Sequence, residues 1–378
     1  MSVAGRAVFE GGATIDCSFE CQSMRIEGKG FGPAGQMSVN GSLMVRGNAD
    51  LDASVRVSGS VRAGDLDVAG HLRSGPLSAH RLRVGGHLEV RGTLEAEEVD
   101  AGGHMTAHGE VKIRNLRVGG HAKVGGGAIS GEIRIRGHFD TTGKLTFGRL
   151  QVYGNTLLPG GSAGEKLTSL GKIVFDGDAS CKELEVSGTA KARGVLSTEN
   201  VSLKGALIAS GNLKASKRFQ VWGSADIAGA LECETLDIGG KLVADRASAT
   251  NRTAVAGEVR TTKGLKSEAL VVGKGSKVTG PIIGGSIDIG SEADMGSLWG
   301  IPWWQGGLGR PTAVEDIHGG NIVIRAHSAA GHIFGRNVMM EEGAMAEEVV
   351  YTGEVKLPKK YFLQKPPRKV DTLPEPPF

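Results

Sequence analysis

Aromatic residues, paired cysteines and long apolar segments are scarce in this sequence. Phe, Trp and Tyr make up only 4% of the 378 residues, which excludes a compact core built on large aromatic side chains. No apolar run approaches the ~18 residues of a membrane-spanning helix. The first residues, MSVAGRAVFEGG, have neither the basic nor the apolar region of a secretion signal. The four cysteines form no CxxC pair and no zinc motif, so we expect a cytoplasmic protein with reduced thiols.

An excess of charge of one sign is also lacking. The 44 Lys and Arg residues nearly balance the 41 Asp and Glu residues, so no nucleic-acid partner is expected. The content of 39% hydrophobic residues excludes a disordered chain. Glycine is abundant, with 61 residues, but it follows no G-X-Y period and comes with only 12 prolines, which excludes collagen.

A short internal repeat organises most of the chain. Steps of 17 from Leu82, with one step of 18 before Phe219, reach apolar residues almost every time, and Thr253 is the exception. An aliphatic residue follows two positions later in most units, and a glycine two positions after that. Three representative units contribute Leu82, Val84, Gly86, Leu150, Val152, Gly154, Leu184, Val186 and Gly188.

The repeat predicts an all-β fold. Alternation of apolar and polar residues with a period of two is typical of strands with one buried face. Each unit holds three short alternating stretches, and glycines separate them at corners where a Cβ would hinder the backbone angles. A chain that turns in this way stacks each strand on its copy one turn earlier, parallel and ~4.8 Å apart. We therefore expect a parallel β-helix, or β-solenoid, with a triangular cross-section and about 17 residues per rung.

The same pattern divides the chain into four segments. We expect a β-helix over residues 1–297, regular from 82, and final β-helix rungs over 321–356. Between them, 298–320 is a Trp-rich insertion that either caps the stack or docks a partner through Trp299, Trp303 and Trp304. Residues 357–378 form a Pro- and Lys-rich tail that we expect to be flexible, and that is a candidate for contact with a membrane or a protein.

Histidines recur at one corner of the repeat. His87, His104, His121 and His138 are separated by exact steps of the repeat, and His71 precedes His87 by a step that is shorter by one position. In a solenoid these imidazoles stack at the surface. They form either a solvated polar edge, or a pH-sensitive or metal-binding strip. The first interpretation is favoured because no carboxylate recurs with them, so no metal site is assigned.

Three cysteines fall at inward positions of the third strand. Cys181 and Cys233 occupy that position three units apart, and Cys21 joins them if the repeat is extended towards the N-terminus. A buried free cysteine usually behaves as a small apolar side chain. We therefore interpret all three as core residues and not as a redox or metal site.

The L-x-V-x-G-x-L-x-V-x-G pattern over residues 82–297 resembles the bactofilin family of polymer-forming cytoskeletal proteins. The resemblance implies a right-handed β-helix that polymerises end to end without nucleotide, often on membranes or as a scaffold. It also implies a structural protein and not an enzyme.

The residues favour the same function. No catalytic or phosphate-binding motif occurs, so neither an enzyme activity nor a cofactor is expected. The first and last rungs of a solenoid carry open strand edges, which are templates for another copy. The expected polymer interface comprises Val8, Phe9, Ile15, Phe19, Val338, Met340, Val349 and Tyr351. Two alternatives stay open: a monomeric or oligomeric scaffold, and an enzyme or metal carrier that uses the histidines.

Overall fold

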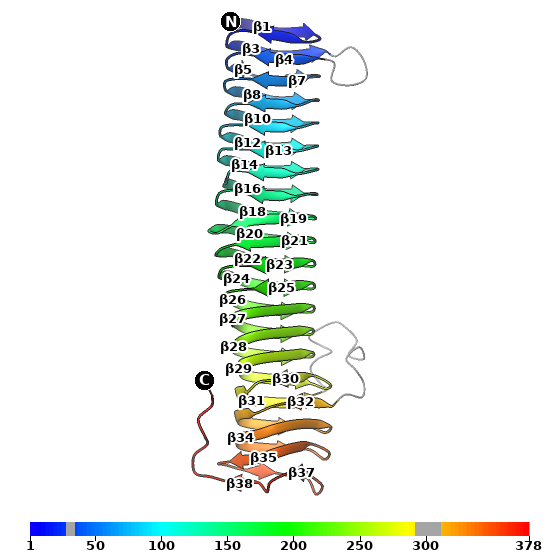
Figure 1. Ribbon diagram of the computed structural model, residues 1–378, viewed down its shortest axis with the longest axis vertical. Coiled ribbons are helices and arrows are strands. Elements are labelled where there is room, and N and C mark those ends of the chain that lie inside the picture. Colours follow the sequence, from blue (N-terminus) through cyan, green and yellow to red (C-terminus); the bar gives the residue numbers. More distant parts are fainter. Residues whose placement is uncertain (28–34, 292–310, 378) are drawn as a thin grey trace. The chain divides into compact units, whose positions relative to one another are not determined.

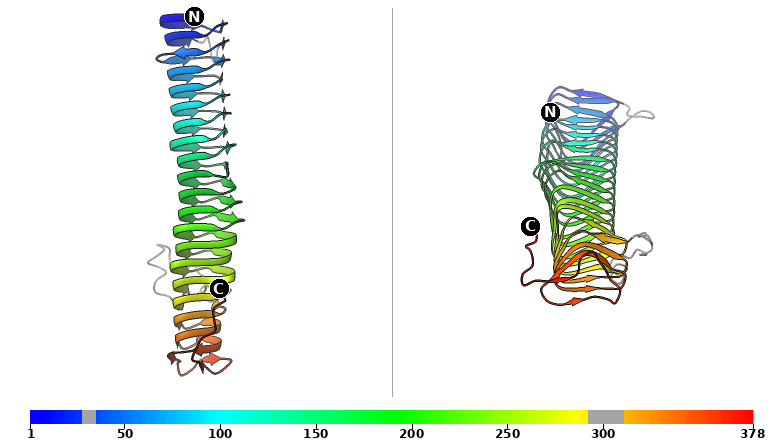
Figure 2. Two further views of the ribbon diagram at one scale, coloured as in Figure 1. Left: turned by 90° about the vertical axis from the view of Figure 1, so that its left-hand side faces the viewer. Right: turned by 60° about the horizontal axis from the view of Figure 1, so that its bottom comes forward.

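The computed structural model describes residues 1–27, 35–291 and 311–377, and all regular structure in these ranges is β-strand. The chain divides into two compact units, Met1–Lys182 and Glu183–Phe378, which are described separately. Within each unit the strands lie one above another as the rungs of a parallel β-solenoid (Figures 1 and 2). The all-β solenoid predicted from the repeat is confirmed, whereas its right-handed turn and triangular section stay predictions.

The strands of the first unit are short and follow one another closely. They are β1 (Ser2–Glu10), β2 (Ala13–Ile15), β3 (Phe19–Glu27), β4 (Gln36–Val39), β5 (Leu43–Val45), β6 (Ala49–Leu51), β7 (Ser54–Val57), β8 (Val61–Val68), β9 (Leu72–Ser74), β10 (Leu77–Val84), β11 (Leu88–Val90), β12 (Leu94–Ala101), β13 (Met105–Ala107), β14 (Val111–Val118), β15 (Ala122–Val124), β16 (Gly127–Ile135), β17 (Phe139–Thr141), β18 (Leu145–Val152), β19 (Asn155–Pro159), β20 (Ser162–Ser169) and β21 (Lys172–Asp176).

The strands of the second unit include longer ones. β22 (Ala179–Val186) crosses the boundary between the units. It is followed by β23 (Thr189–Ala192), β24 (Leu196–Leu203), β25 (Ala206–Ala209), β26 (Leu213–Val221), β27 (Ser224–Ile238), β28 (Lys241–Val255), β29 (Glu258–Gly273), β30 (Lys277–Thr279), β31 (Ile282–Ser291), β32 (Thr312–Val314), β33 (Ile317–Ile324), β34 (Ser328–Met340), β35 (Met345–Tyr351), β36 (Val355–Lys356), β37 (Phe362–Leu363) and β38 (Arg368–Lys369).

The register of the strands reproduces the sequence repeat. Leu82 of β10 lies opposite Val99 of β12, its equivalent in the next unit, and on the other side opposite Leu66 of β8. Leu150 of β18 lies in the same way between Ile133 and Leu167. The six aliphatic side chains of the three representative units are buried, at no more than 2% exposure. The core of each unit is therefore a stack of like side chains, as the repeat predicts.

The glycines of the first corner are required for a different reason from the expected one, whereas Gly126, Gly177 and Gly280 of the second corner have the expected positive φ. Gly86 and Gly154 do not have the positive φ that only glycine adopts easily. Instead, a Cβ at Gly154 would lie 2.2 Å from the carbonyl oxygen of Gly137, one turn earlier. The same contact recurs at Gly240, where a Cβ would lie 1.9 Å from the carbonyl oxygen of Gly223. These glycines let the backbones of successive turns approach closely, which is a second use of the residue.

The second unit continues its stack on both sides of residues 292–310. Ile287 of β31 lies opposite Ile322 of β33, and Ala313 of β32 pairs with Lys277 of β30. The guanidinium of Arg325 binds both carboxylate oxygens of Asp288, at 2.8 and 2.7 Å, and so ties the two sides together. Regular structure resumes at 312, earlier than the expected boundary at 321, because this segment already has the register of a rung.

Candidate assembly surfaces

The first turn of the first unit has one unpaired side. β1 pairs with β3 from Ser2 to Glu10, and β2 pairs with β4. In residues 1–27, 35–291 and 311–377, no other strand pairs with β1 or β2. The N–H and C=O groups along the free edge of a strand are a template for pairing with another chain. This edge is therefore a candidate surface for self-association.

The four interface residues expected at this turn do not all lie at the surface. Val8 is 50% exposed. Phe9 is half-buried and packs edge-on against Phe19, with 6.0 Å between the ring centroids. Phe19 and Ile15 point into the core. Val8 and Phe9 can thus contact a partner directly, whereas Ile15 and Phe19 stabilise the turn that carries them.

The last turn of the second unit is covered by the end of the chain. β37 pairs with Met345 and Ala346 of β35, and β38 pairs with Val350 and Tyr351 of the same strand. The backbone N–H groups of Lys365 and Val370 also donate to β35, to the carbonyl oxygens of Glu347 and Tyr351 at 3.1 and 2.9 Å. This arrangement differs from the flexible tail expected from composition, because the edge of β35 supplies hydrogen-bond partners that composition does not reveal.

The outer side of this tail is a poor template for a further strand. Pro366 and Pro367 separate β37 from β38, and proline has no N–H to donate to a neighbouring strand. Exposed lysines such as Lys365 and Lys369 add charge along the same edge. Proline and lysine are residues with which natural proteins protect sheet edges. The tail therefore acts as a cap on the last turn.

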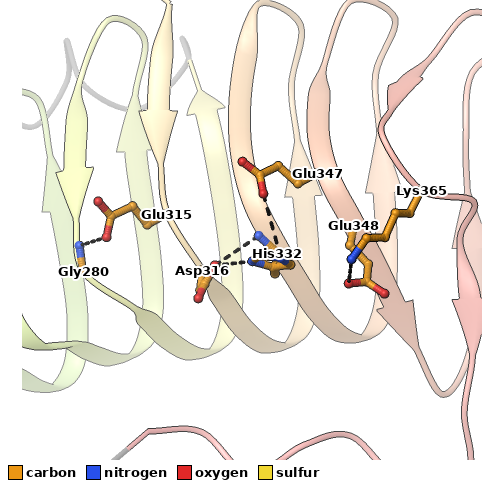
Figure 3. A network of polar contacts seen from close by, with 7 residues as sticks. All are labelled: Gly280, Glu315, Asp316, His332, Glu347, Glu348 and Lys365. Carbon is orange, nitrogen blue, oxygen red and sulfur yellow. Dashed lines mark hydrogen bonds and ion pairs between the residues drawn. The ribbon is translucent and has the colours of Figure 1, made fainter.

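Polar contacts hold this cap in place (Figure 3). The carboxylate of Glu348 on β35, 17% exposed, binds the Nζ of Lys365 at 3.2 Å and lies 3.9 Å from the guanidinium of Arg368. On the preceding turns, the Nδ1 of His332 lies 2.9 Å from Asp316 and its Nε2 lies 3.8 Å from Glu347. Oppositely charged or hydrogen-bonding groups thus link successive turns up to the tail.

The C-terminal interface residues expected from sequence do not form an open edge. Val338, Met340 and Val349 are buried in the core. Tyr351 is half-buried, and its backbone pairs with Gly335 on one side and with Lys369 of the tail on the other. An interface through these residues requires the tail to leave β35.

The histidines stack as the repeat predicts. Successive ring centroids, from His71 to His138, lie 4.6 to 4.9 Å apart, and all five rings are exposed. The Nδ1 atoms of His71 and His104 accept hydrogen bonds from the backbone N–H groups of His87 and His121, at 3.0 and 3.3 Å. The amide of Asn155 extends the column by contacting the Nε2 of His138 at 2.9 Å.

These contacts define what the histidine column can do chemically. A ring nitrogen that accepts a hydrogen bond carries no proton, so these bonds require the deprotonated Nδ1 of His71 and His104. Within the described part of the chain, no group of three His, Cys, Asp or Glu side chains is placed to hold a metal ion. The column therefore presents ring nitrogens that accept backbone hydrogen bonds and support the corner.

The inward cysteines lie in the core. Cys21, Cys181 and Cys233 are buried and form no disulfide, whereas Cys17 is an exposed free cysteine. Burial raises the pKa of Cys181 and of Cys233 to about 12, and it also raises the pKa of Cys21. A thiol with a raised pKa forms little of the reactive thiolate. This agrees with a packing role.

Comparison with family models, with curated proteins and with solved structures finds no match to this chain. Among the residues that the structure describes, no helix is long and apolar enough to cross a membrane. Trp299, Trp303 and Trp304 lie outside the described residues.

Proposed function

We propose that this chain is a structural scaffold that assembles with copies of itself through the free edge of its first turn. The observation that carries the proposal is the unpaired side of β1 and β2, with Val8 exposed beside it. The aliphatic and glycine repeat, which resembles that of the bactofilin family, supports the same function. The resemblance implies end-to-end filaments that form in the cytoplasm without nucleotide.

The capped last turn adds a condition to this proposal. A head-to-tail filament needs the first turn of one copy to meet the last turn of the next, which is a contact that repeats without closing. While β37 and β38 occupy the edge of β35, that contact is blocked. We therefore propose that the capped chain associates only through its first turn, as a pair of copies, and that release of the tail permits filaments.

The first test changes the free edge. Val8→Lys places a charge beside β1 at a position that is already 50% exposed, so the fold is expected to survive. Sedimentation is expected to show smaller assemblies than for the wild type. The matched control is Ile208→Lys, which changes a 44% exposed side chain on β25, a strand paired on both sides. Equal assembly of the wild type and Val8→Lys, or a monomeric wild type at tens of micromolar, contradicts the proposal.

The second test releases the cap. Lys365→Glu together with Arg368→Glu places two carboxylates against Glu348, which repels them. Electron microscopy without nucleotide is expected to show filaments for this variant, whereas the capped wild type is expected to remain as pairs of copies. The control pair, Lys359→Glu with Lys360→Glu, makes the same change of charge at exposed tail positions. Identical polymer lengths for the two double variants would mean that the tail does not control the last turn.

The exposed part of the tail is also a candidate for contact with a membrane or a protein. Lys359 and Lys360 are exposed, as are Tyr361 at 45% and Phe362 at 63%. Cationic and aromatic side chains together suit an anionic lipid surface.

A further inference from the structure

Three arginines line one groove of the first unit. The groove has a volume of about 310 Å³ and follows the ends of β4, β7 and β9. Arg56 lies on β7, Arg73 on β9, and Arg91 directly after β11. We call this surface the arginine groove and define it by Arg56, Arg73, Arg91 and the hydroxyl-bearing Ser58 beside them.

Two of these arginines are stacked on each other. Arg56 lies directly opposite Arg73 in the parallel register of β7 and β9. Stacked strands are ~4.8 Å apart, so two like charges meet at a distance where repulsion is appreciable. At one other outward position of this unit the sign of charge alternates, since Arg83 lies between Asp67 and Asp100. Further along the same column, however, Arg117 lies opposite Arg134. Arg56 and Arg73, in addition, line one groove together with a third arginine.

One carboxylate partly compensates the three cations. The Oε1 of Glu89 lies 3.2 Å from the guanidinium of Arg73 and 3.3 Å from that of Arg91. Arg56 forms no ion pair or side-chain hydrogen bond with any residue in the described ranges. The carboxylate of Asp16 accepts a hydrogen bond at 2.7 Å from Asn40, which lines the groove. The groove thus holds an excess of positive charge, and the guanidinium of Arg56 has no ion-pair partner among the described residues.

Guanidinium groups select a particular class of ligand. Their planar N–H donors match the paired oxygens of phosphate and carboxylate groups, and they bind phosphate with more geometric specificity than lysine does. A larger groove of about 740 Å³ in this unit is also lined by cations, such as Arg62 and Lys112, but its own lining includes Glu95 and Glu97, which offset part of that charge. We propose that the arginine groove binds a phosphate-type dianion, with Arg56 and Arg73 as its main ligands and Ser58 as an additional donor.

The proposal is tested on the full chain by titration calorimetry at low ionic strength, with pyrophosphate as the probe. The wild type is expected to bind, and the affinity is expected to fall as salt is added because the contact is ionic. Arg56→Gln is expected to weaken binding at least tenfold. The control is Arg117→Gln, an exposed arginine on β14 that does not line the groove, and it is expected to bind as the wild type does.

Vesicles of phosphatidylcholine with and without phosphatidic acid distinguish a lipid phosphate from a soluble one. One supporting outcome is that the wild type and Arg117→Gln bind the acidic vesicles, that Arg56→Gln does not, and that pyrophosphate is not bound. This outcome supports the groove and assigns its phosphate to a lipid. Binding of neither probe by the wild type overturns the proposal. Equal weakening by Arg56→Gln and Arg117→Gln also overturns it, because the effect then depends only on total charge.

Discussion

The close approach of successive corners predicts a large effect for a small substitution, Gly154→Ala. The added Cβ would lie 2.2 Å from the carbonyl oxygen of Gly137, more than 1 Å short of the ordinary contact distance of 3.4 Å. Neither atom belongs to a flexible side chain. The backbone N–H of Tyr153 donates to the carbonyl oxygen of Ile135 at 3.1 Å, and that of Lys172 donates to the carbonyl oxygen of Gly154 at 3.0 Å, so the ladder resists a shift on both sides.

The magnitude follows from two opposing terms. Overpacking of a well-packed site costs about 1–3 kcal/mol. Replacing glycine by alanine also restricts the unfolded chain, which stabilises the fold by about 0.4–1 kcal/mol where the site accepts the methyl group. At Gly154 we expect the first term to dominate and the free energy of unfolding to fall. At Gly5 of β1, nothing lies within 4 Å of an added Cβ, so only the second term applies.

Denaturant unfolding followed by circular dichroism compares the two variants. Gly154→Ala is expected to lower the midpoint for the first unit, and Gly5→Ala to leave it unchanged or raise it slightly. A Gly154→Ala variant as stable as Gly5→Ala would refute the assigned cause of the corner glycines. In that case the corners could separate without loss, and the glycine column would need another explanation.

Three further predictions concern the core, the thiols and acid. Leu150→Asp places an unpaired charge in the aliphatic stack, which costs several kcal/mol. The first unit should therefore lose the circular dichroism signal of its folded state. The control Arg149→Ala, on the same strand, should retain that signal. A thiol reagent should modify Cys17 rapidly in the native protein and the other three cysteines only after unfolding. Burial lowers the pKa of His318, which stacks on Phe334 with ring centroids 4.7 Å apart, although the charge of Asp316 opposes this. The imidazole of His318 therefore binds a proton more readily in the unfolded chain than in the folded one. The free energy of unfolding should be at its full value above about pH 6.5 and should fall as the pH drops below that value. In thermal melts, His318→Gln should lose less stability at low pH than the wild type does.

Much of the fold follows from the spacing of aliphatic residues alone. One step of the repeat from Leu82 predicts the residue that lies opposite it, Val99, and the same step predicts the contacts of Leu150. This works because every turn repeats one environment, so a single periodicity determines both the local structure and the long-range pairing. The turns before Leu82 are harder to assign, since the step from Leu72 to its partner Leu88 is one position shorter than the regular repeat.

The candidate sites are less accessible to such reasoning. The composition of the tail, from residue 357 onwards, does not predict that it packs by itself. β37 and β38 of this tail form because they pair with the edge of β35. The burial of Val338 and Met340 likewise depends on which turn is the last one, and a repeat does not specify where it stops. The arginine groove needs the register, because Arg56 and Arg73 are unremarkable until they are placed opposite each other.

A solenoid places each residue beside its own equivalent, so every outward column must tolerate close contact with itself. Two solutions are present in the first unit. Imidazoles tolerate each other because neutral rings stack and their nitrogens accept backbone hydrogen bonds, as His71 does from His87. Part of one charged column alternates in sign, with Asp100 between Arg83 and Arg117. The stacked Arg56 and Arg73 follow neither solution, and an anion bound between them would supply the opposite charge that Asp100 supplies between Arg83 and Arg117.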